Sequence, residues 1–476
     1  MDRTDCTAAG GLPHTQGELE RGLKDRHIQL IALGGAIGVG LFLGSAKAIH
    51  KAGPLLLVSY AIAGLAIFFI MRALGELLVH RPVAGSFATY AETYVSPWAG
   101  FVTGWTYWFT WVVTGMAELT AIGIYAHYWF PAIPQWVPAL ATLAVLLGVN
   151  LIAVKVFGEL EFWFALIKVV TIVATLVLGV AIIMTGWGPL GQTASFSNLW
   201  SHGGFAPMGM VGVVFTLQIA CFAYTGVELI GVTAGEAEAP EKVLPRATNS
   251  IVYRILIFYV GALIVIMSLV PWNELSPDMS PFVHVFEKLG VPAAAGIINF
   301  VVITAAASSC NSGIFSTGRM LYTLAQFKQA PARLGRVNSR HVPAAGIVLS
   351  AAFMLVGVVL NYLVPEEAFI YVTSIATIGA VWTWGIIVYA HLRYRRAVRQ
   401  GQAAAVSYRM PGAPFTNWFV LAFLLVVLGC LALDASTRIA LYVAPIWFGL
   451  LTVGYRMYAA RTASGPHLAR QKQRLA

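Results

Sequence analysis

The chain has 476 residues, of which 58% are hydrophobic and only 11% are charged, and its formal net charge is +10. Soluble domains are about 25% charged, so this composition excludes an ordinary water-soluble globular protein. A membrane span takes about twenty apolar residues, and the chain has room for about twelve such segments. The positive residues lie in short loops between apolar runs, where they set membrane topology, so we expect no nucleic acid partner.

The four cysteines are widely scattered and show no paired spacing, so neither a metal site nor a disulfide framework is expected. We expect no cofactor. Residues 1–26 are polar and lack the short apolar core and small-residue cleavage site of a signal peptide. We therefore expect them to be a cytoplasmic tail, and residues 27–458 to be the membrane domain.

The first half of the chain predicts five membrane spans. They are expected near residues 27–50, 53–79, 97–130, 136–154 and 161–184. Pro54 opens the second span, as proline often does at the first helical position. The third span ends in an aromatic cluster, Tyr125, Tyr128, Trp129 and Phe130, which is typical of a membrane interface.

The first span is unusual because it is rich in glycine. Its segment 31–44, IALGGAIGVGLFLG, holds five glycines: Gly34, Gly35, Gly38, Gly40 and Gly44. Each glycine inside a helix costs about 0.5–1 kcal/mol relative to alanine. Broken helices are tolerated at membrane depth where the freed backbone lines an enclosed cavity. The run therefore predicts a discontinuous helix at a binding site.

The second half predicts seven further spans, of which the sixth repeats this peculiarity. They are expected near residues 208–235, 251–270, 293–324, 344–363, 368–394, 415–433 and 439–458. A Gly/Ser-rich loop, 186–207, precedes the sixth span, and a short amphipathic segment, 281–289, precedes the eighth. The sixth span carries Gly226, Gly231 and Gly235. Two glycine-interrupted spans, five spans apart, indicate an inverted-repeat transporter with spans 1–5 and 6–10 as its units.

Loop charges assign the orientation of the spans. Most lysines and arginines fall in alternate loops and in the tail after the twelfth span, whereas the opposite loops hold Lys47, Lys51, Lys288 and Arg438. Lys155 is the one residue that breaks the alternation. The asymmetry places both termini in the cytoplasm, in agreement with an even number of spans.

Backbone groups at the two breaks predict a site for an amino acid. The N–H groups of Gly38, Val39 and Gly40 would bind a carboxylate at the N-terminus of a half-helix. Unpaired carbonyls between Ala223 and Gly226 would accept from an ammonium group. The alternative is that the small residues serve close packing between helices.

Ionisable side chains inside spans are expensive and indicate function. Lys168, in the fifth span, can take up and release a proton; the alternative is that it snorkels to the interface. Glu118 and Glu228 are each a candidate proton carrier, gate element or ordinary bond between helices. Phe222 and Tyr224 flank the break of the sixth span and are placed to form a lid. A hydroxyl-rich stripe of the eighth span either lines the pathway or bonds to neighbouring helices: Ser308, Ser309, Asn311, Ser312, Ser316 and Thr317.

Six segments resemble the amino-acid permeases of the amino acid–polyamine–organocation superfamily. They are RHIQLIALGGAIGVGLFLG (26–44), AGP (52–54), RALGELLVHRP (72–82), FGELEFWFALIKV (157–169), GEAEAPEKVLPRATNS (235–250) and SGIFSTGRMLYTLA (312–325). The resemblance implies an all-α polytopic fold with about twelve transmembrane helices. It consists of a 5+5 inverted repeat (27–185 and 207–395) plus two C-terminal helices (414–458), and 459–476 would be a cytoplasmic tail.

The family pattern also implies roles for individual residues. Ile37, Gly38, Val39 and Gly40 would line the carboxylate site, and Phe222, Ala223, Tyr224 and Gly226 the amino-group site. Lys168 falls where proton-coupled relatives place a lysine instead of a sodium ion, and Glu228 falls on the gating glutamate. Val39 departs from the pattern, because relatives usually have Ser or Thr there.

The expected function is proton-coupled uptake of a small neutral amino acid by alternating access, with the proton as coupling ion and no enzymatic activity. GWTYWFTWVVTGMAE (104–118) resembles the D-serine/D-alanine/glycine permeases. Other segments resemble the proline, asparagine and aromatic branches, which remain alternatives, as do an exchanger and a nutrient sensor. The expected partners are the amino acid and the lipid of the cytoplasmic (inner or plasma) membrane; the sequence carries no signal for an oligomeric state. A membrane-embedded enzyme lacks support, because no convergent His/Cys/Asp cluster is present.

Overall fold

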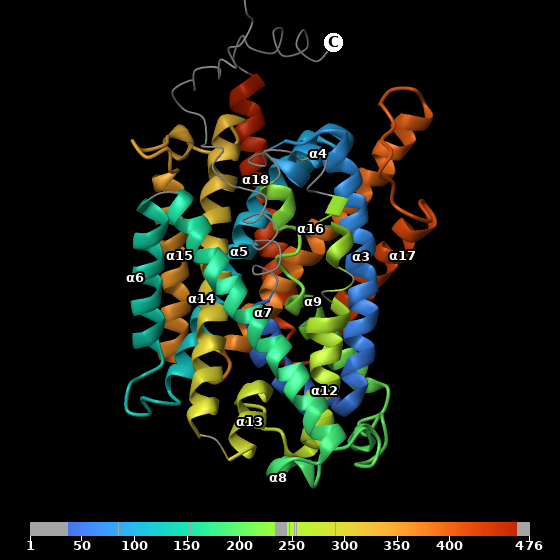
Figure 1. The fold of residues 1–476 in the computed structure, drawn as a ribbon. Coiled ribbons are helices and arrows are strands. Elements are labelled where there is room, and N and C mark those ends of the chain that lie inside the picture. The colour runs from blue at the N-terminus through green and yellow to red at the C-terminus, as the bar shows by residue number, and fades with distance from the viewer. Residues whose placement is uncertain are drawn as a thin grey trace, which may run out of the picture.

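A computed structural model describes residues 37–83, 85–152, 154–233, 245–246, 248–251, 253, 255–290 and 292–463. Within these ranges the regular structure is entirely helical. Gly34, Gly35 and Gly235, the beginning of the first predicted span, the predicted N-terminal tail and residues 464–476 lie outside the described residues. The predicted C-terminal tail begins too early at 459, because the last helix continues to Ala463. The chain forms a bundle whose long helices run roughly side by side (Figure 1).

The first half contributes the following helices: η1 (Gly40–Gly44), α2 (Ser45–Ala52), η2 (Gly53–Leu55), α3 (Leu56–His80), α4 (Ser86–Tyr94), α5 (Pro97–Ala126), α6 (Trp136–Ile152) and α7 (Val154–Thr185). The second predicted span is confirmed, with a short 3-10 turn at Pro54 before α3. The sequence assigned residues 80–94 to a link and missed α4, a nine-residue helix.

The second half contributes α8 (Gly188–Gly191), η3 (Phe196–Leu199), α9 (Val211–Ala223), α10 (Leu229–Thr233), η5 (Ile255–Gly261), α12 (Ala262–Leu269), η6 (Trp272–Glu274), α13 (Pro281–Lys288), α14 (Pro292–Gln326), η7 (Ala332–Gly335), α15 (Ala344–Leu363), α16 (Ala368–Arg399), α17 (Phe415–Leu433) and α18 (Ile439–Ala463). The bounds of the ninth and eleventh spans match their predictions. The tenth was predicted too short, because α16 continues to Arg399.

Among the described residues, nine helical stretches are long and apolar enough to cross a membrane. The stretch Gly40–His80 is counted as one of them, although it holds the end of the first predicted span and all of the second. Two shorter apolar helices, α6 and α9, have 17 and 13 residues. The chain is therefore a multi-pass membrane protein, and the count of twelve spans stays a prediction.

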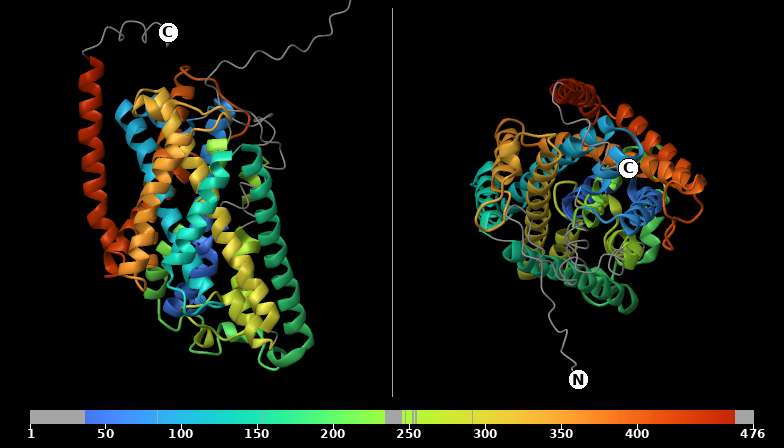
Figure 2. Two further views of the ribbon diagram at one scale, coloured as in Figure 1. Left: turned by 90° about the vertical axis from the view of Figure 1, so that its left-hand side faces the viewer. Right: turned by 90° about the horizontal axis from the view of Figure 1, so that it is seen from above.

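Helix α5 lies at the centre of the bundle. It is buried along almost its whole length and packs against α14, α16 and α4. Helices α6, α7 and α18 expose large apolar side chains instead: Val145, Val177 and Met457 are 65%, 66% and 56% exposed. Figure 2 shows α18 at the edge of the bundle. Such exposed apolar surface suits contact with lipid hydrocarbon rather than with water.

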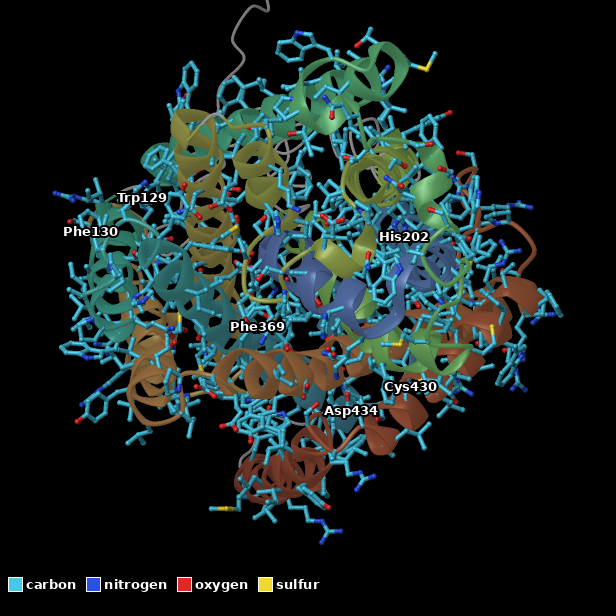
Figure 3. The ribbon with its side chains drawn as sticks, turned by 90° about the horizontal axis from the view of Figure 1, so that it is seen from below. Trp129, Phe130, His202, Phe369, Cys430 and Asp434 are labelled. Atoms are coloured by element: carbon cyan, nitrogen blue, oxygen red, sulfur yellow. The ribbon has the colours of Figure 1, made fainter. Side chains whose placement is uncertain are left out.

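The two ends of the bundle differ in composition. Helix α4 lies at one end with the 400–414 loop and the arginine-rich C-terminal end of α16, and α8 and α13 lie at the other (Figure 1). Figure 3 views this second end and shows Trp129 and Phe130 at its rim. Both rings are exposed, as expected of interfacial aromatic residues.

An ion pair joins two distant segments at the α8–α13 end. Nζ of Lys51 donates to Oδ2 of Asp434 at 2.5 Å, which links the end of α2 to the α17–α18 turn. Figure 3 shows Asp434 beside the ends of the last helices. Partial burial works to raise the pKa of Asp434, but hydrogen bonds from Lys51 and from Ser436 outweigh it and hold that pKa below its usual value.

We expect Asp434→Asn to lower the free energy of unfolding by about 0.5–1 kcal/mol at neutral pH, because the pair is partly exposed. The folded-state pKa lies below the unfolded value of about 3.9. The contribution is therefore fully present above that value and disappears as the pH falls through the folded-state pKa. Denaturation of the purified protein across this pH range measures it. Glu366→Gln, an exposed site at the same end, is the control; equal losses in both variants would contradict the assignment.

Candidate functional site

The two glycine-interrupted segments meet inside the bundle. A side chain on Gly40 would place its Cβ only 2.5 Å from the Cα of Ala223, so the two backbones are in direct contact. All eleven site residues predicted from the sequence are buried: Ile37, Gly38, Val39, Gly40, Glu118, Lys168, Phe222, Ala223, Tyr224, Gly226 and Glu228. The structure therefore brings both predicted halves of the site together.

The first break leads into a wide helical turn. Val39 precedes the π-helical turn η1, and no side chain caps this helix start. The amide of Leu41 donates to the carbonyl of Gly38 at 3.2 Å. A Cβ on Gly38 would overlap the carboxylate of Glu118, so this glycine allows the close approach of α5.

The second break separates α9 from α10 and depends on Gly226. Its φ of +105° is a conformation that side chains other than glycine rarely adopt. The Gly226 amide donates to both carboxylate oxygens of Glu228, at 3.3 and 3.2 Å. Nε1 of Trp384 on α16 donates to the same carboxylate at 3.2 Å. Glu228 thus stabilises the broken backbone and ties it to α16.

The carbonyls at this break are mostly paired, which corrects the expectation that they are free. The Ala223 carbonyl accepts from the hydroxyl of Tyr259 at 3.0 Å. The carbonyls of Tyr224 and Gly226 accept from backbone amides further along the turn. A carbonyl oxygen has two lone pairs, so an ammonium group would share these acceptors with existing donors.

Tyr224, predicted with Phe222 to form a lid, makes contacts within the bundle. Its hydroxyl donates to the carbonyl of Tyr60 at 3.0 Å. Its ring packs 4.7 Å from that of Tyr259 and 5.9 Å from that of Tyr60, between α3 and η5. The side chain therefore anchors the break to its neighbours. Phe222 points elsewhere and packs edge-on against Phe369 of α16.

The Val39 amide, which the sequence predicts to bind a carboxylate, is hydrogen-bonded to the carboxylate of Glu118. The backbone N–H of Val39 donates to Oε2 of Glu118 at 3.2 Å, and both groups are buried. The donor is thus a backbone group, as the sequence predicts for a position without a hydroxyl. Glu118 supplies to this donor the same functional group that an amino acid would.

Lys168 is directly connected to the first break. Its Nζ donates to the carbonyl of Ile37 at 3.1 Å and to the hydroxyl of Ser308 at 2.9 Å. The Ser308 hydroxyl donates in turn to Oε1 of Glu161 at 2.6 Å. Lys168 is fully buried, so the alternative that it snorkels to the interface is wrong. A buried chain of hydrogen bonds thus connects Glu161 of α7, Ser308 of α14 and Lys168 of α7 to the backbone carbonyl of Ile37 at the first break.

Glu161 is a functional candidate that the sequence analysis missed. It is fully buried and lies seven residues before Lys168 on α7. A spacing of seven places two side chains on one face of a helix, two turns apart. That spacing, with opposite charges in an apolar span, is the signal that identifies the pair.

The predicted hydroxyl-rich stripe of α14 is buried throughout. Part of it bonds to neighbouring helices: Ser308 contacts α7, and Oδ1 of Asn311 accepts from Asn150 of α6 at 2.7 Å. The hydroxyls of Ser312 and Ser316 lie beside Glu161 of α7 and Tyr107 of α5. The stripe therefore bonds α14 to neighbouring helices.

Comparison with known proteins identifies the family. The amino acid permease family model matches residues 27–465. An uncharacterized amino acid permease of Bacillus subtilis, YtnA, is 55% identical over 438 residues, 92% of this chain and 95% of its own. The probable threonine/serine transporter YbxG of B. subtilis is 49% identical over 459 residues, 96% of this chain and 98% of its own. The D-serine/D-alanine/glycine transporter of Escherichia coli K12 is 47% identical over 467 residues, 98% and 99% of the two chains.

These are the similarities expected of a membrane transport protein. The chain belongs to the amino acid permease family. The resemblance found in the sequence motifs is confirmed.

Proposed function

We propose that this permease takes up a small neutral amino acid together with a proton, by alternating access across the cytoplasmic membrane. The observation that carries the proposal is the pair of bonds that connect titratable side chains to the first break. Glu118 accepts from the Val39 amide, and Lys168 donates to the Ile37 carbonyl. The backbone expected to hold the substrate is thus bonded to two groups that can change protonation.

The proposed architecture has twelve spans, with residues 27–185 and 207–395 as inverted five-helix repeats and 414–458 as two further helices. Both termini lie in the cytoplasm. Lysines and arginines that cluster at the α4 end support this orientation. Two broken segments in contact at Gly40 and Ala223 support a site at the repeat interface.

In the proposed site, Ile37, Gly38, Val39 and Gly40 hold the carboxylate of the substrate. Phe222, Ala223, Tyr224 and Gly226 line the amino-group end. Every one of these residues is buried, so the substrate reaches them only when neighbouring helices move, as alternating access requires.

The proposed coupling depends on competition for one donor. The Val39 amide has one N–H, which can donate to the Glu118 carboxylate or to the carboxylate of the substrate. The two carboxylates therefore compete for this donor. A proton on Glu118 removes its charge and weakens its hold on the amide. Protonation and substrate binding then favour each other, which is a reciprocal coupling between the two sites.

The proposed substrates are D-serine, D-alanine and glycine. Support comes from the E. coli relative at 47% identity, which is named as a D-serine/D-alanine/glycine transporter. The relative named as a probable threonine/serine transporter makes L-serine and L-threonine a second candidate set. L-proline, L-asparagine, an aromatic amino acid, an exchange mode and a sensor role are the remaining alternatives.

Uptake by proteoliposomes under an imposed proton gradient tests the function. We expect labelled glycine to accumulate above its outside concentration, and D-serine and D-alanine to compete with it more strongly than aromatic or charged amino acids. Competition led by L-threonine would move the assignment to the second candidate set. Glycine flux that stops at equal concentrations despite the gradient would contradict proton-coupled uptake.

We expect Lys168→Ala to abolish accumulation driven by a pH gradient while leaving exchange of substrate measurable. The substitution removes the cation that connects α7 and Ser308 to the Ile37 carbonyl. The control is Lys288→Ala, which removes an exposed lysine on α13 paired with Glu274. Gradient-driven accumulation at the wild-type level in Lys168→Ala would remove this lysine from the mechanism.

We expect Glu118→Gln to make the affinity for substrate nearly independent of pH. In the wild type, affinity should rise as the pH falls, by at most about tenfold per pH unit for one linked proton. Equilibrium binding of labelled glycine to the purified protein measures this without transport. The control is Glu287→Gln on α13, which should keep the wild-type slope. An unchanged slope in Glu118→Gln would exclude competition at Val39.

A further inference from the structure

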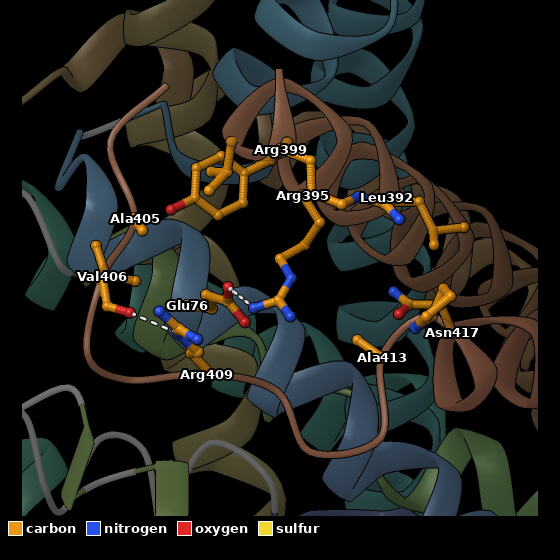
Figure 4. Close-up of a pocket in the computed structure, with 12 residues that line it drawn as sticks. Glu76, Leu392, Arg395, Arg399, Ala405, Val406, Arg409, Ala413 and Asn417 are labelled. Atoms are coloured by element: carbon orange, nitrogen blue, oxygen red, sulfur yellow. Dashed lines mark hydrogen bonds and ion pairs between the residues drawn. The ribbon is translucent and has the colours of Figure 1, made fainter. Parts of the chain in front are cut away.

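A cavity of about 250 Å³ lies at the arginine-rich end of the bundle. It is enclosed by α3, the C-terminal end of α16, the 400–414 loop and the start of α17, and Figure 4 shows its lining side chains. Sites for drug-sized ligands measure about 300–1,000 Å³, so this one suits a smaller polar group. It lies apart from the two broken helices described above.

The acidic residue of the cavity is already fully engaged. Oε1 of Glu76 accepts from Nη1 of Arg395 at 3.0 Å. Oε2 lies 2.9 Å from Nε2 of His391 and accepts from the amide of Met410 at 2.6 Å. Glu76 is buried and holds the 400–414 loop against α3 and α16. One cation, Arg395, balances its charge.

Two further arginines leave the cavity positively charged. Nε of Arg409 donates to the carbonyl of Val406 at 3.2 Å, which leaves its charge without an acidic partner within the described ranges. The side chain of Arg399 has no hydrogen bond or ion pair to any described residue. Figure 4 shows Arg395 and Arg409 on either side of Glu76. Such a cavity favours an anionic ligand, and guanidinium groups match phosphate in particular.

A long apolar groove of about 590 Å³ starts where the cavity ends. It runs between α16, α17 and α18 and is lined almost wholly by apolar atoms. On α17, Asn417 of the cavity and Leu421, Leu424 and Leu428 of the groove are spaced by four, three and four residues. Residues so spaced lie on one face of a helix. Cavity and groove therefore follow each other along the same face.

The same continuity holds on α16, where Leu392 of the cavity follows Tyr389 and Gly385 of the groove by three and seven residues. Tyr389 and Trp418 mark the junction and are 39% and 61% exposed, as residues at the interface often are. From Tyr389 to Arg395 the helix rises by about 9 Å. The headgroup layer on each side of the hydrocarbon core is about 5–8 Å thick, so the arginines reach its level.

We propose that cavity and groove together bind one phospholipid with an anionic headgroup. The phosphate contacts Arg399 and Arg409, and an acyl chain occupies the groove beside Gly385. The buried Oδ1 of Asn417, which has no hydrogen-bond partner among the described residues, accepts from a headgroup hydroxyl. Phosphatidylglycerol has the phosphate, the acyl chain and the headgroup hydroxyl that these contacts require. This site is independent of the transported amino acid and of proton coupling.

Binding to the purified full-length protein, by native mass spectrometry and by thermal stabilisation, tests the proposal with three probes. Phosphatidylglycerol presents both parts of the ligand. Diacylglycerol with the same chains presents only the acyl part, and inorganic phosphate presents only the anionic part. We expect phosphatidylglycerol to bind far more tightly than either of the others.

Two variants separate the headgroup from the chain. Arg399→Gln with Arg409→Gln should weaken phosphatidylglycerol binding by about fivefold for each arginine, or about 25-fold in all. The control is Arg396→Gln with Arg393→Gln, which removes two arginines of the same helix end that do not line the cavity. Gly385→Leu fills the groove, where among the described residues a Cβ would contact only Leu424, at 3.7 Å. It should weaken lipid binding and leave phosphate binding unchanged.

Equal losses in the cavity and control double variants would overturn the proposal, since charge alone and not this cavity would then attract the lipid. Phosphate binding as tight as that of phosphatidylglycerol, with no effect of Gly385→Leu, would also overturn it and assign a soluble phosphate site instead. Loss of amino acid uptake in any variant has no bearing on these binding results. The outcome is therefore separate from that of the proposed transport function.

Discussion

The contact between Gly40 and Ala223 is the constraint on which the rest of the structure depends. Inside a bilayer every backbone group must find a partner within the protein, so a broken helix survives only where neighbours supply those partners. In this bundle the Glu118 carboxylate accepts from the Val39 amide, and Nζ of Lys168 donates to the Ile37 carbonyl. The Tyr259 hydroxyl donates to the Ala223 carbonyl, and the Glu228 carboxylate accepts from the Gly226 amide. Glu118, Lys168 and Glu228 are ionisable groups that stabilise the breaks, so stability and proposed function share the same atoms.

Sequence reasoning succeeded where one residue pattern determines one structural feature. The ends of α15 and α17 follow from sharp changes in polarity, and the breaks follow from the cost of glycine. It did less well on the direction of side chains beyond a break. Helix α9 ends at Ala223, so its periodicity gives no means of predicting that Tyr224 packs against Tyr259. Glu161 was accessible from its spacing to Lys168, because both lie on one uninterrupted helix.

The role of Glu76 was beyond prediction for a different reason. Its partners lie up to 334 positions away, in α16 and in a loop that carries no membrane signal of its own. A buried carboxylate with three donors is costly to disrupt, because removing one partner leaves charge without compensation. The same cluster explains why the 400–414 loop is held against the helices. The loop in turn places Arg409 beside a cavity that no local sequence pattern reveals.

The two carboxylates that meet broken backbone, Glu118 and Glu228, differ in what they can exchange. The Glu228 carboxylate accepts from the Gly226 amide in its own turn and from the indole of Trp384. Breaking these bonds would free the Gly226 amide, which belongs to the predicted amino-group end and not to the predicted carboxylate site. Glu118 comes from another helix and binds the Val39 amide. In the proposed site, a substrate carboxylate would replace Glu118 at this amide without loss of a hydrogen bond. Because one carboxylate would replace another, the Val39 amide would keep a hydrogen bond during binding and release of the substrate. Helix α5 carries Glu118 and packs against both α14 and α16. In the proposed mechanism it is therefore the element that would connect protonation to movement of the bundle.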